Sequence, residues 1–185
     1  MKNTLLASLT IVVVFVQCAS DKSVKPTVDN EQASSQLMKE LVPQLTGSWT
    51  MKQLRIKSIN NSGQNELKIR KDTTLTNFAI LTLARASLQN NPIRDRYEGS
   101  IQYASKTYPI RFDLLAGAIA GKGPKAYFLL EYNFPVGYSG PTEKEAYFLE
   151  RIGILLETFA LETVSGSMTW HGLNRGIDQI DLVKN

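Results

Sequence analysis

The chain has 185 residues, enough for one domain with a sizeable core, and its 43% hydrophobic and 21% charged residues are typical of a globular protein. Its 21 Lys and Arg are interleaved with 17 Asp and Glu, so the net charge of +4 is spread along the chain. Nucleic-acid-binding proteins usually cluster their basic residues, and we expect no nucleic-acid partner here. The single cysteine, Cys18, excludes a disulfide within the chain and a metal site built from several cysteines.

Residues 1–17 have the layout of a secretory signal peptide. Lys2 precedes an apolar run from Leu5 to Val16, which is too short for the roughly 20 residues that a membrane-spanning helix needs. Cys18 follows in "FVQC", which resembles the lipobox of bacterial lipoproteins, although Gln17 stands where that motif usually has Gly, Ala or Ser. The resemblance implies that the signal peptide is removed and that Cys18 carries a lipid such as palmitate.

Two other interpretations of this segment are open. A signal peptidase could cut after Ser20, or Cys18 could be a small hydrophobic residue of an uncleaved segment. Residues 18–33 are polar and show no periodicity, which predicts a flexible tether and favours the lipid anchor. Such an anchor would hold a domain of residues 34–185 at a membrane of the cell envelope, for which we expect the outer membrane, on either face.

A short amphipathic helix is predicted after the tether. Its apolar residues recur at helical spacing, namely Leu37, Met38, Leu41, Val42 and Leu45. The helix begins either after Ser34 or Ser35, or after Asp29 with Gln32 completing a capping box. Pro43 is expected to end or distort it.

From Leu45 onwards the period changes to two, which predicts strands. The first runs from Ser48 to Ser58, and a phase slip at Lys52–Gln53 indicates a β-bulge. Further strands are predicted at 67–70, 74–88, 97–103, 108–114, 128–134, 166–173 and 177–184. Residues 97–103 and 108–114 form a hairpin, because their apolar faces can point the same way. Loops are predicted at 60–65, 116–124 and 135–142.

Residues 143–164 fit either a helix or strands, and we favour strands because of their aromatic, isoleucine and threonine content. The chain then has eight to ten antiparallel strands after one helix. With little helix to cover a second face, these strands bury their apolar faces against one another. The sequence predicts a mainly β protein with an antiparallel up-and-down β-barrel, which removes exposed edges, or alternatively a β-sandwich.

The stretch "LTGSWTMKQL" places Gly47 and Trp49 in a Gly-x-Trp motif at the start of the first strand, just after the helix. This pattern resembles that of the lipocalins and the wider calycin group, and the resemblance covers about residues 35–185. It implies a lipocalin-like barrel in which Trp49, at the closed end, packs against an arginine near the last strand, for which Arg175 is the candidate. With the lipobox, the chain resembles small lipocalin-like lipoproteins of bacterial envelopes. The two internal motifs of typical lipocalins are not evident.

Catalytic and metal-binding patterns are weak in this sequence. The one histidine, His171, alternates with Met168 and Trp170 and is predicted to be an exposed strand residue. "GAIAGKGPK" lacks the GK[ST] ending of a phosphate-binding loop. Four carboxylates among Lys and Arg predict a solvated face: Glu145, Glu150, Glu157 and Glu162. We expect no enzyme activity, no metal and no cofactor.

The aromatic residues are the better indication of function. They lie on the apolar faces of three predicted strands: Tyr97, Tyr103, Tyr108, Phe112, Phe128, Tyr132 and Phe134. Such faces either fill a small barrel or line an apolar ligand cavity in a wider one. We therefore expect the protein to bind a small apolar ligand inside the barrel. The alternative is a non-enzymatic envelope protein that binds another protein or a polysaccharide through loops 116–124 and 135–142, the latter carrying Tyr138; a filled interior would favour it. The oligomeric state is left open.

Overall fold

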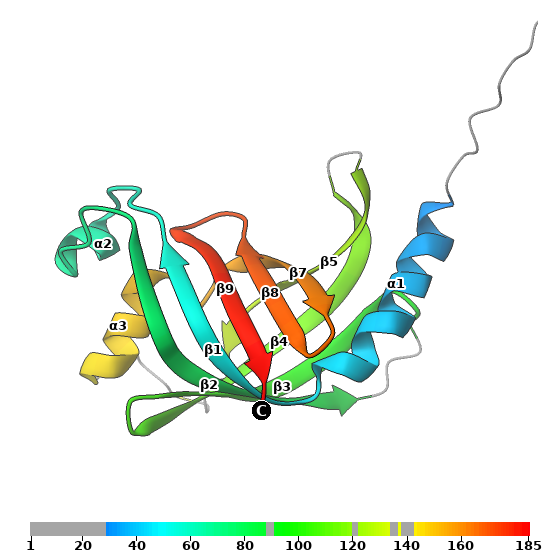
Figure 1. Ribbon diagram of the computed structural model, residues 1–185, viewed down its shortest axis with the longest axis horizontal. Coiled ribbons are helices and arrows are strands. Elements are labelled where there is room, and N and C mark those ends of the chain that lie inside the picture. Colours follow the sequence, from blue (N-terminus) through cyan, green and yellow to red (C-terminus); the bar gives the residue numbers. More distant parts are fainter. Residues whose placement is uncertain (1–28, 88–90, 120–121, 134–136, 138–142) are drawn as a thin grey trace, which may run out of the picture.

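The computed structural model describes residues 29–87, 91–119, 122–133, 137 and 143–185 (Figure 1). The predicted signal peptide, Cys18 and most of the predicted tether lie outside the described residues, as do Phe134 and Tyr138. Within the described ranges, no helix is long and apolar enough to cross a membrane.

Eight antiparallel strands form a closed barrel. They are β1 (Gly47–Ile56), β2 (Thr73–Ser87), β3 (Arg94–Tyr103), β4 (Lys106–Ile119), β5 (Lys122–Leu129), β7 (Thr158–Val164), β8 (Ser167–Gly172) and β9 (Ile177–Lys184). Each pairs with the next of the eight, and β9 pairs with β1. The two-residue β6 (Glu131–Tyr132) pairs with β4. The predicted up-and-down barrel is confirmed, and the alternative β-sandwich is wrong.

Two details of strand pairing were predictable from side-chain alternation. The β1–β2 register shifts between Met51 and Gln53, which confirms the predicted bulge. In the β3–β4 hairpin Tyr97 pairs with Phe112, so both apolar faces point into the barrel. The predicted glycine-rich loop 116–124 is wrong in extent, because β4 continues to Ile119 and β5 begins at Lys122.

Helix α1 (Asn30–Leu45) covers one end of the barrel (Figure 1). The Asp29 side chain accepts hydrogen bonds from the backbone N–H groups of Glu31 (3.0 Å) and Gln32 (3.2 Å), so the earlier of the two predicted helix starts is confirmed. Residues 30–33, the last of the predicted tether, therefore belong to α1. Pro43 lies inside the helix and does not end it.

The region 143–164, predicted as strands, is helical in its first half. Helix α3 (Lys144–Ile152) buries Ala146, Leu149 and Ile152, which are spaced at three residues, and β7 follows it. Gly153 ends the helix with φ 84°, a left-handed conformation that glycine adopts without a steric penalty. Helical spacing therefore outweighed the β-propensity of the aromatic and β-branched residues.

The connection between β1 and β2 also differs from the prediction. Residues predicted as a simple turn contain helix α2 (Ser62–Glu66), which Asn61 caps by accepting a hydrogen bond from the Gln64 backbone N–H at 2.7 Å. The predicted strand at 67–70 is absent from this described segment, where Lys68 has φ 59°. Helices α2 and α3 lie at the barrel end opposite α1 (Figure 1). We call these the α3 end and the α1 end.

Candidate ligand-binding groove

The predicted interior aromatics form a packed core. Phe128 is fully buried, and its ring centroid lies 4.3 Å from that of Phe112 and 4.9 Å from that of Trp170. Tyr97 stacks on Phe112 at 5.3 Å, and burial raises the pKa of its hydroxyl. Aromatic rings at these separations fill the centre of the barrel and leave no room there for a ligand.

Three other predicted aromatics, Tyr103, Tyr108 and Tyr132, lie towards the α3 end. Tyr103 stacks on Phe148 of α3 with ring centroids 5.7 Å apart, and so helps to attach that helix to the barrel. The rings of Tyr108 and Tyr132 lie 6.3 Å apart. Tyr132 also lines a surface groove, which makes it the member of the predicted set that lies at a candidate site.

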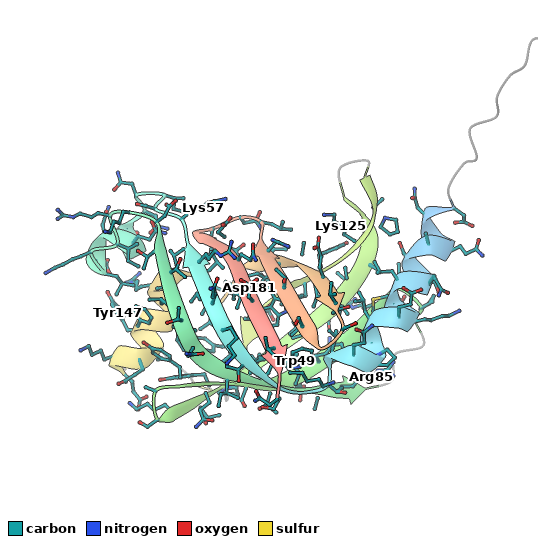
Figure 2. All side chains as sticks on the ribbon, in the orientation of Figure 1. Trp49, Lys57, Arg85, Lys125, Tyr147 and Asp181 are labelled. Carbon is teal, nitrogen blue, oxygen red and sulfur yellow. The ribbon has the colours of Figure 1, made fainter. Side chains whose placement is uncertain are left out.

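One part of the expected Gly-x-Trp arrangement is present in the structure, and the other is not. Gly47 has φ 122°, and the Trp49 indole N–H donates a hydrogen bond to the Leu45 carbonyl at 2.9 Å, at the α1 end (Figure 2). The expected packing of Arg175 on Trp49 is wrong, because Arg175 lies in the β8–β9 turn at the α3 end. Lys184 takes that place, with its Nζ atom 5.3 Å from the centroid of the Trp49 ring.

The α3 end of the barrel is closed by apolar side chains. Leu149 and Ile152 of α3, with Ile154 and Leu155 after it, are at most 2% exposed. The segment between β5 and β7 returns to the barrel through the Leu156 N–H, which donates to the Leu130 carbonyl at 2.7 Å. A lipocalin-like ligand entrance at this end is therefore occupied by the protein's own residues.

A groove of about 770 Å³ lies beside this closure. We call it the rim groove. Five segments line it: 59 and 61–63 before and within α2, Arg111 of β4, 131–132 of β6, 150–153 and 155–156 of α3 and its C-terminal extension, and the 174–176 turn. Its volume is within the range of about 300–1,000 Å³ that small-molecule sites occupy.

Exposed apolar side chains mark the entrance of the rim groove. Ile59 is 48% exposed and Leu156 is 52% exposed, while Ile152 and Leu155 beneath them are buried. Leu156 has φ 67°, a left-handed conformation that costs a bulky residue about 1–2 kcal/mol. The backbone thus holds an apolar side chain in solvent at an energetic cost, a pattern that is more common at functional sites than elsewhere.

Glu157 fixes one wall of the groove from inside. Its side chain is fully buried, and its carboxylate accepts hydrogen bonds from the backbone N–H groups of Thr158 (2.9 Å), Asn174 (2.9 Å) and Arg175 (2.7 Å). The three bonds tie the start of β7 to the β8–β9 turn. This carboxylate was predicted to be solvated, and that prediction is wrong for Glu157.

Helix α2, another wall of the groove, is also held by hydrogen bonds of a buried side chain. The buried Gln64 side chain accepts from the Ile59 N–H at 2.8 Å and donates to the Lys57 carbonyl at 2.7 Å. A Cβ atom on Gly176 would lie 2.3 Å from Nε2 of Gln64, and one on Gly63 would lie 2.7 Å from the Arg151 carbonyl oxygen. The walls therefore approach each other at glycines, and the groove is preorganised.

The charged side chains of the groove differ in their partners. Arg111 lies 3.4 Å from the Glu131 carboxylate, and Arg151 lies 2.9 Å from that of Glu66. The Arg151 guanidinium also lies 4.7 Å from the centroid of the Tyr147 ring. Tyr147 lies on α3 (Figure 2). A hydrogen bond with Tyr147 raises the pKa of Arg151.

The remaining predicted polar residues do not assemble a catalytic site. His171 is partly exposed on β8, with Nε2 3.7 Å from a Glu162 carboxylate oxygen. Glu145 pairs with Lys106 at 3.1 Å. Within the ranges that the structure describes, no three residues of His, Cys, Asp or Glu are placed to hold a metal ion.

Comparisons with known proteins gave no match: no family model, no curated protein and no solved structure is similar to this chain at the significance required. Sequence reasoning missed the rim groove because its walls come from five separated segments. The one available signal was Gly153 followed by the apolar stretch Ile154–Leu156, which is hydrophobic without a strand-like alternation.

Proposed function

We propose that this protein is a non-enzymatic binding protein of the bacterial cell envelope whose ligand occupies the rim groove. The observation that carries the proposal is a preorganised groove with an apolar floor beside a barrel whose centre is filled. The filled centre argues against carriage of an apolar ligand inside the barrel. The predicted alternative, binding of another protein or a polysaccharide through loops 116–124 and 135–142, concerns a different surface, because no described residue of either loop lines the rim groove.

The proposed anchor is compatible with an accessible groove. A lipid on Cys18 would hold the chain at a membrane through the residues that precede α1. Helices α2 and α3, which contribute to the lining of the rim groove, lie at the barrel end opposite α1 (Figure 1). A protein held in this way would leave the groove open to the aqueous phase of the envelope. Mass spectrometry of the mature N-terminus tests the anchor: we expect an acylated Cys18, and an unmodified start at Asp21 would refute it.

Binding can be tested with N-phenyl-1-naphthylamine, a neutral apolar probe that fluoresces when it leaves water. We expect saturable binding to the purified chain, and an affinity about tenfold lower for Leu156→Asp, which places a charge at the apolar entrance. Ile59→Asp is a second variant of the same entrance. The matched control is Val164→Asp, an apolar side chain 74% exposed at the α1 end, for which we expect no change.

Circular dichroism verifies that each variant is folded. The proposal would be refuted by the absence of saturable binding, or by equal affinities for the two groove variants and the Val164→Asp control.

A further inference from the structure

Arg175 differs from the other arginines of the rim groove in having no acidic partner among the residues that the structure describes. Arg111 and Arg151 each have a carboxylate within 4.0 Å, but across the described residues no carboxylate lies that close to Arg175, whose side chain is exposed. An arginine at a groove without an internal partner keeps its planar set of N–H donors free for an anion.

The position of Arg175 is fixed although its head group is free. Its backbone N–H is held by the buried Glu157 carboxylate at 2.7 Å. The start of its side chain runs beside Gly153, where an added Cβ atom would lie 3.7 Å from the Arg175 Cβ and 3.8 Å from its Cδ. Fixing the backbone and the stem in advance lowers the conformational entropy that the arginine loses when it binds a ligand.

From these features we infer that the rim groove binds an amphipathic ligand with an apolar body and one anionic group, which pairs with Arg175. The apolar body would lie against Ile59 and Leu156 at the entrance and Leu155 beneath them. A carboxylate, sulfonate or phosphate matches a guanidinium through paired, charge-assisted hydrogen bonds. This inference rests on the proposed function, since it names the ligand of the same groove.

The remaining charges of the groove favour a single anionic group over a polyanion. The lining contains Arg111, Arg151 and Arg175 against Glu131 and Glu150, a surplus of one positive charge. Glu150 is exposed and, among the described residues, has no Lys or Arg side chain within 4.0 Å. Its negative charge would repel an extended polyanion, while Arg175 could still pair with one group.

Two probes with the same aromatic body test this inference. 8-Anilinonaphthalene-1-sulfonate is N-phenyl-1-naphthylamine with an added sulfonate, so their affinity ratio reports the contribution of the anion. We expect Arg175→Gln to lower the affinity for the sulfonate probe about tenfold and to leave that for the neutral probe within about twofold. Arg175→Lys should recover part of the loss, because it restores the charge without the planar donors.

Arg70→Gln is the matched control, because Arg70 is exposed, likewise has no carboxylate within 4.0 Å among the described residues, and does not line the groove. We expect it to leave both affinities unchanged. Glu150→Gln should raise the affinity for the sulfonate probe, because it removes a repulsive charge.

The outcomes separate the inference from the proposed function. If Leu156→Asp weakens binding of the neutral probe but Arg175→Gln leaves the ratio of the two affinities unchanged, the inference is refuted and the proposed function is retained. If Arg175→Gln weakens both probes equally and lowers the thermal stability, Arg175 has a structural role and the inference is refuted. If neither probe binds, the proposed function fails as well.

Discussion

The buried carboxylate of Glu157 accepts a hydrogen bond from the backbone N–H of Arg175 at 2.7 Å, although the two residues are 18 positions apart in the chain. The same carboxylate accepts from Thr158 and Asn174. One side chain thus connects the barrel core to the wall of the rim groove, and both the stability of the protein and the geometry of the groove depend on it.

We predict that Glu157→Gln destabilises the protein by about 2–3 kcal/mol. Either orientation of the glutamine amide directs an NH₂ group at a backbone N–H, so at least one buried donor loses its acceptor. Chemical denaturation monitored by circular dichroism measures the change. Glu150→Gln removes the same charge from an exposed position and should change stability by less than about 0.5 kcal/mol. Equal effects of the two substitutions would show that Glu157 does not have this role.

Leu156→Gly should separate binding from stability. Glycine relieves a left-handed backbone strain of about 1–2 kcal/mol, which offsets roughly the loss of a half-buried leucine side chain. Leu173→Gly is the matched control, because Leu173 is 47% exposed and does not have a positive φ. We expect the control to be less stable than Leu156→Gly by about 1–2 kcal/mol.

For binding of the neutral probe, Leu156→Gly should be the more damaging of the two substitutions. Leu156→Gly removes an apolar contact at the groove entrance and should weaken binding, while Leu173→Gly should not. If Leu156→Gly is as destabilising as the control, the backbone strain at Leu156 is not present in solution.

Phe128→Leu tests whether the centre of the barrel is core or binding site. The Phe128 ring is fully buried against Phe112 and Trp170, so its shortening should destabilise the protein by about 1–2 kcal/mol. Affinity for N-phenyl-1-naphthylamine should stay unchanged, because the probe binds in the rim groove. Thermal denaturation and probe titration measure the two quantities. A changed affinity with unchanged stability would instead indicate a ligand inside the barrel.

An ion cluster on the outer face of β3 and β4 predicts a loss of stability in acid. Hydrogen bonds from Arg96 (2.7 Å) and Arg94 lower the pKa of Asp113 to about 2. Because this folded-state pKa is below the unfolded value of about 3.9, the stabilisation is present above pH 4 and is lost as the pH falls towards 2. We expect a contribution of about 1 kcal/mol after screening by solvent.

Asp113→Asn removes the titrating group and provides the comparison. At neutral pH the variant should be about 1 kcal/mol less stable than the parent chain, and the difference should shrink between pH 4 and pH 2. Urea denaturation at a series of pH values measures it. A difference that does not depend on pH in this range would contradict the assignment to Asp113.

The barrel was predictable because most of its strands show a side-chain pattern within a short stretch of sequence. Side chains alternate in β3 and β4, and the phase slip at Lys52–Gln53 is visible in ten residues of sequence. Helix α3 was not predictable in the same way, because the spacing of Leu149 and Ile152 competes with the β-propensity of their neighbours. The predicted cation beside Trp49 is Arg175, but the structure has Lys184 there. The register of β9 against β1 decides which cation reaches the ring, and the sequence alone does not reveal that register.

The candidate site was less predictable than the fold. Its walls join segments up to about a hundred residues apart, and none carries a motif. The contacts that shape it, such as the Glu157 carboxylate on the 174–175 backbone, pair a side chain with N–H groups whose positions no sequence pattern encodes. The closure between Trp49 on β1 and Lys184 on β9 joins residues that are still further apart in the chain.

Because β1 pairs with β9, the barrel can close only after the last strand has been made. The edge of β1 that pairs with β9 has no partner until the last strand arrives, so a chain completed only to β8 has two open edges. Open edges can pair with other chains, and contacts between distant residues form slowly. Until β9 is in place, pairing of the free edge of β1 with other chains would therefore compete with closure of the barrel.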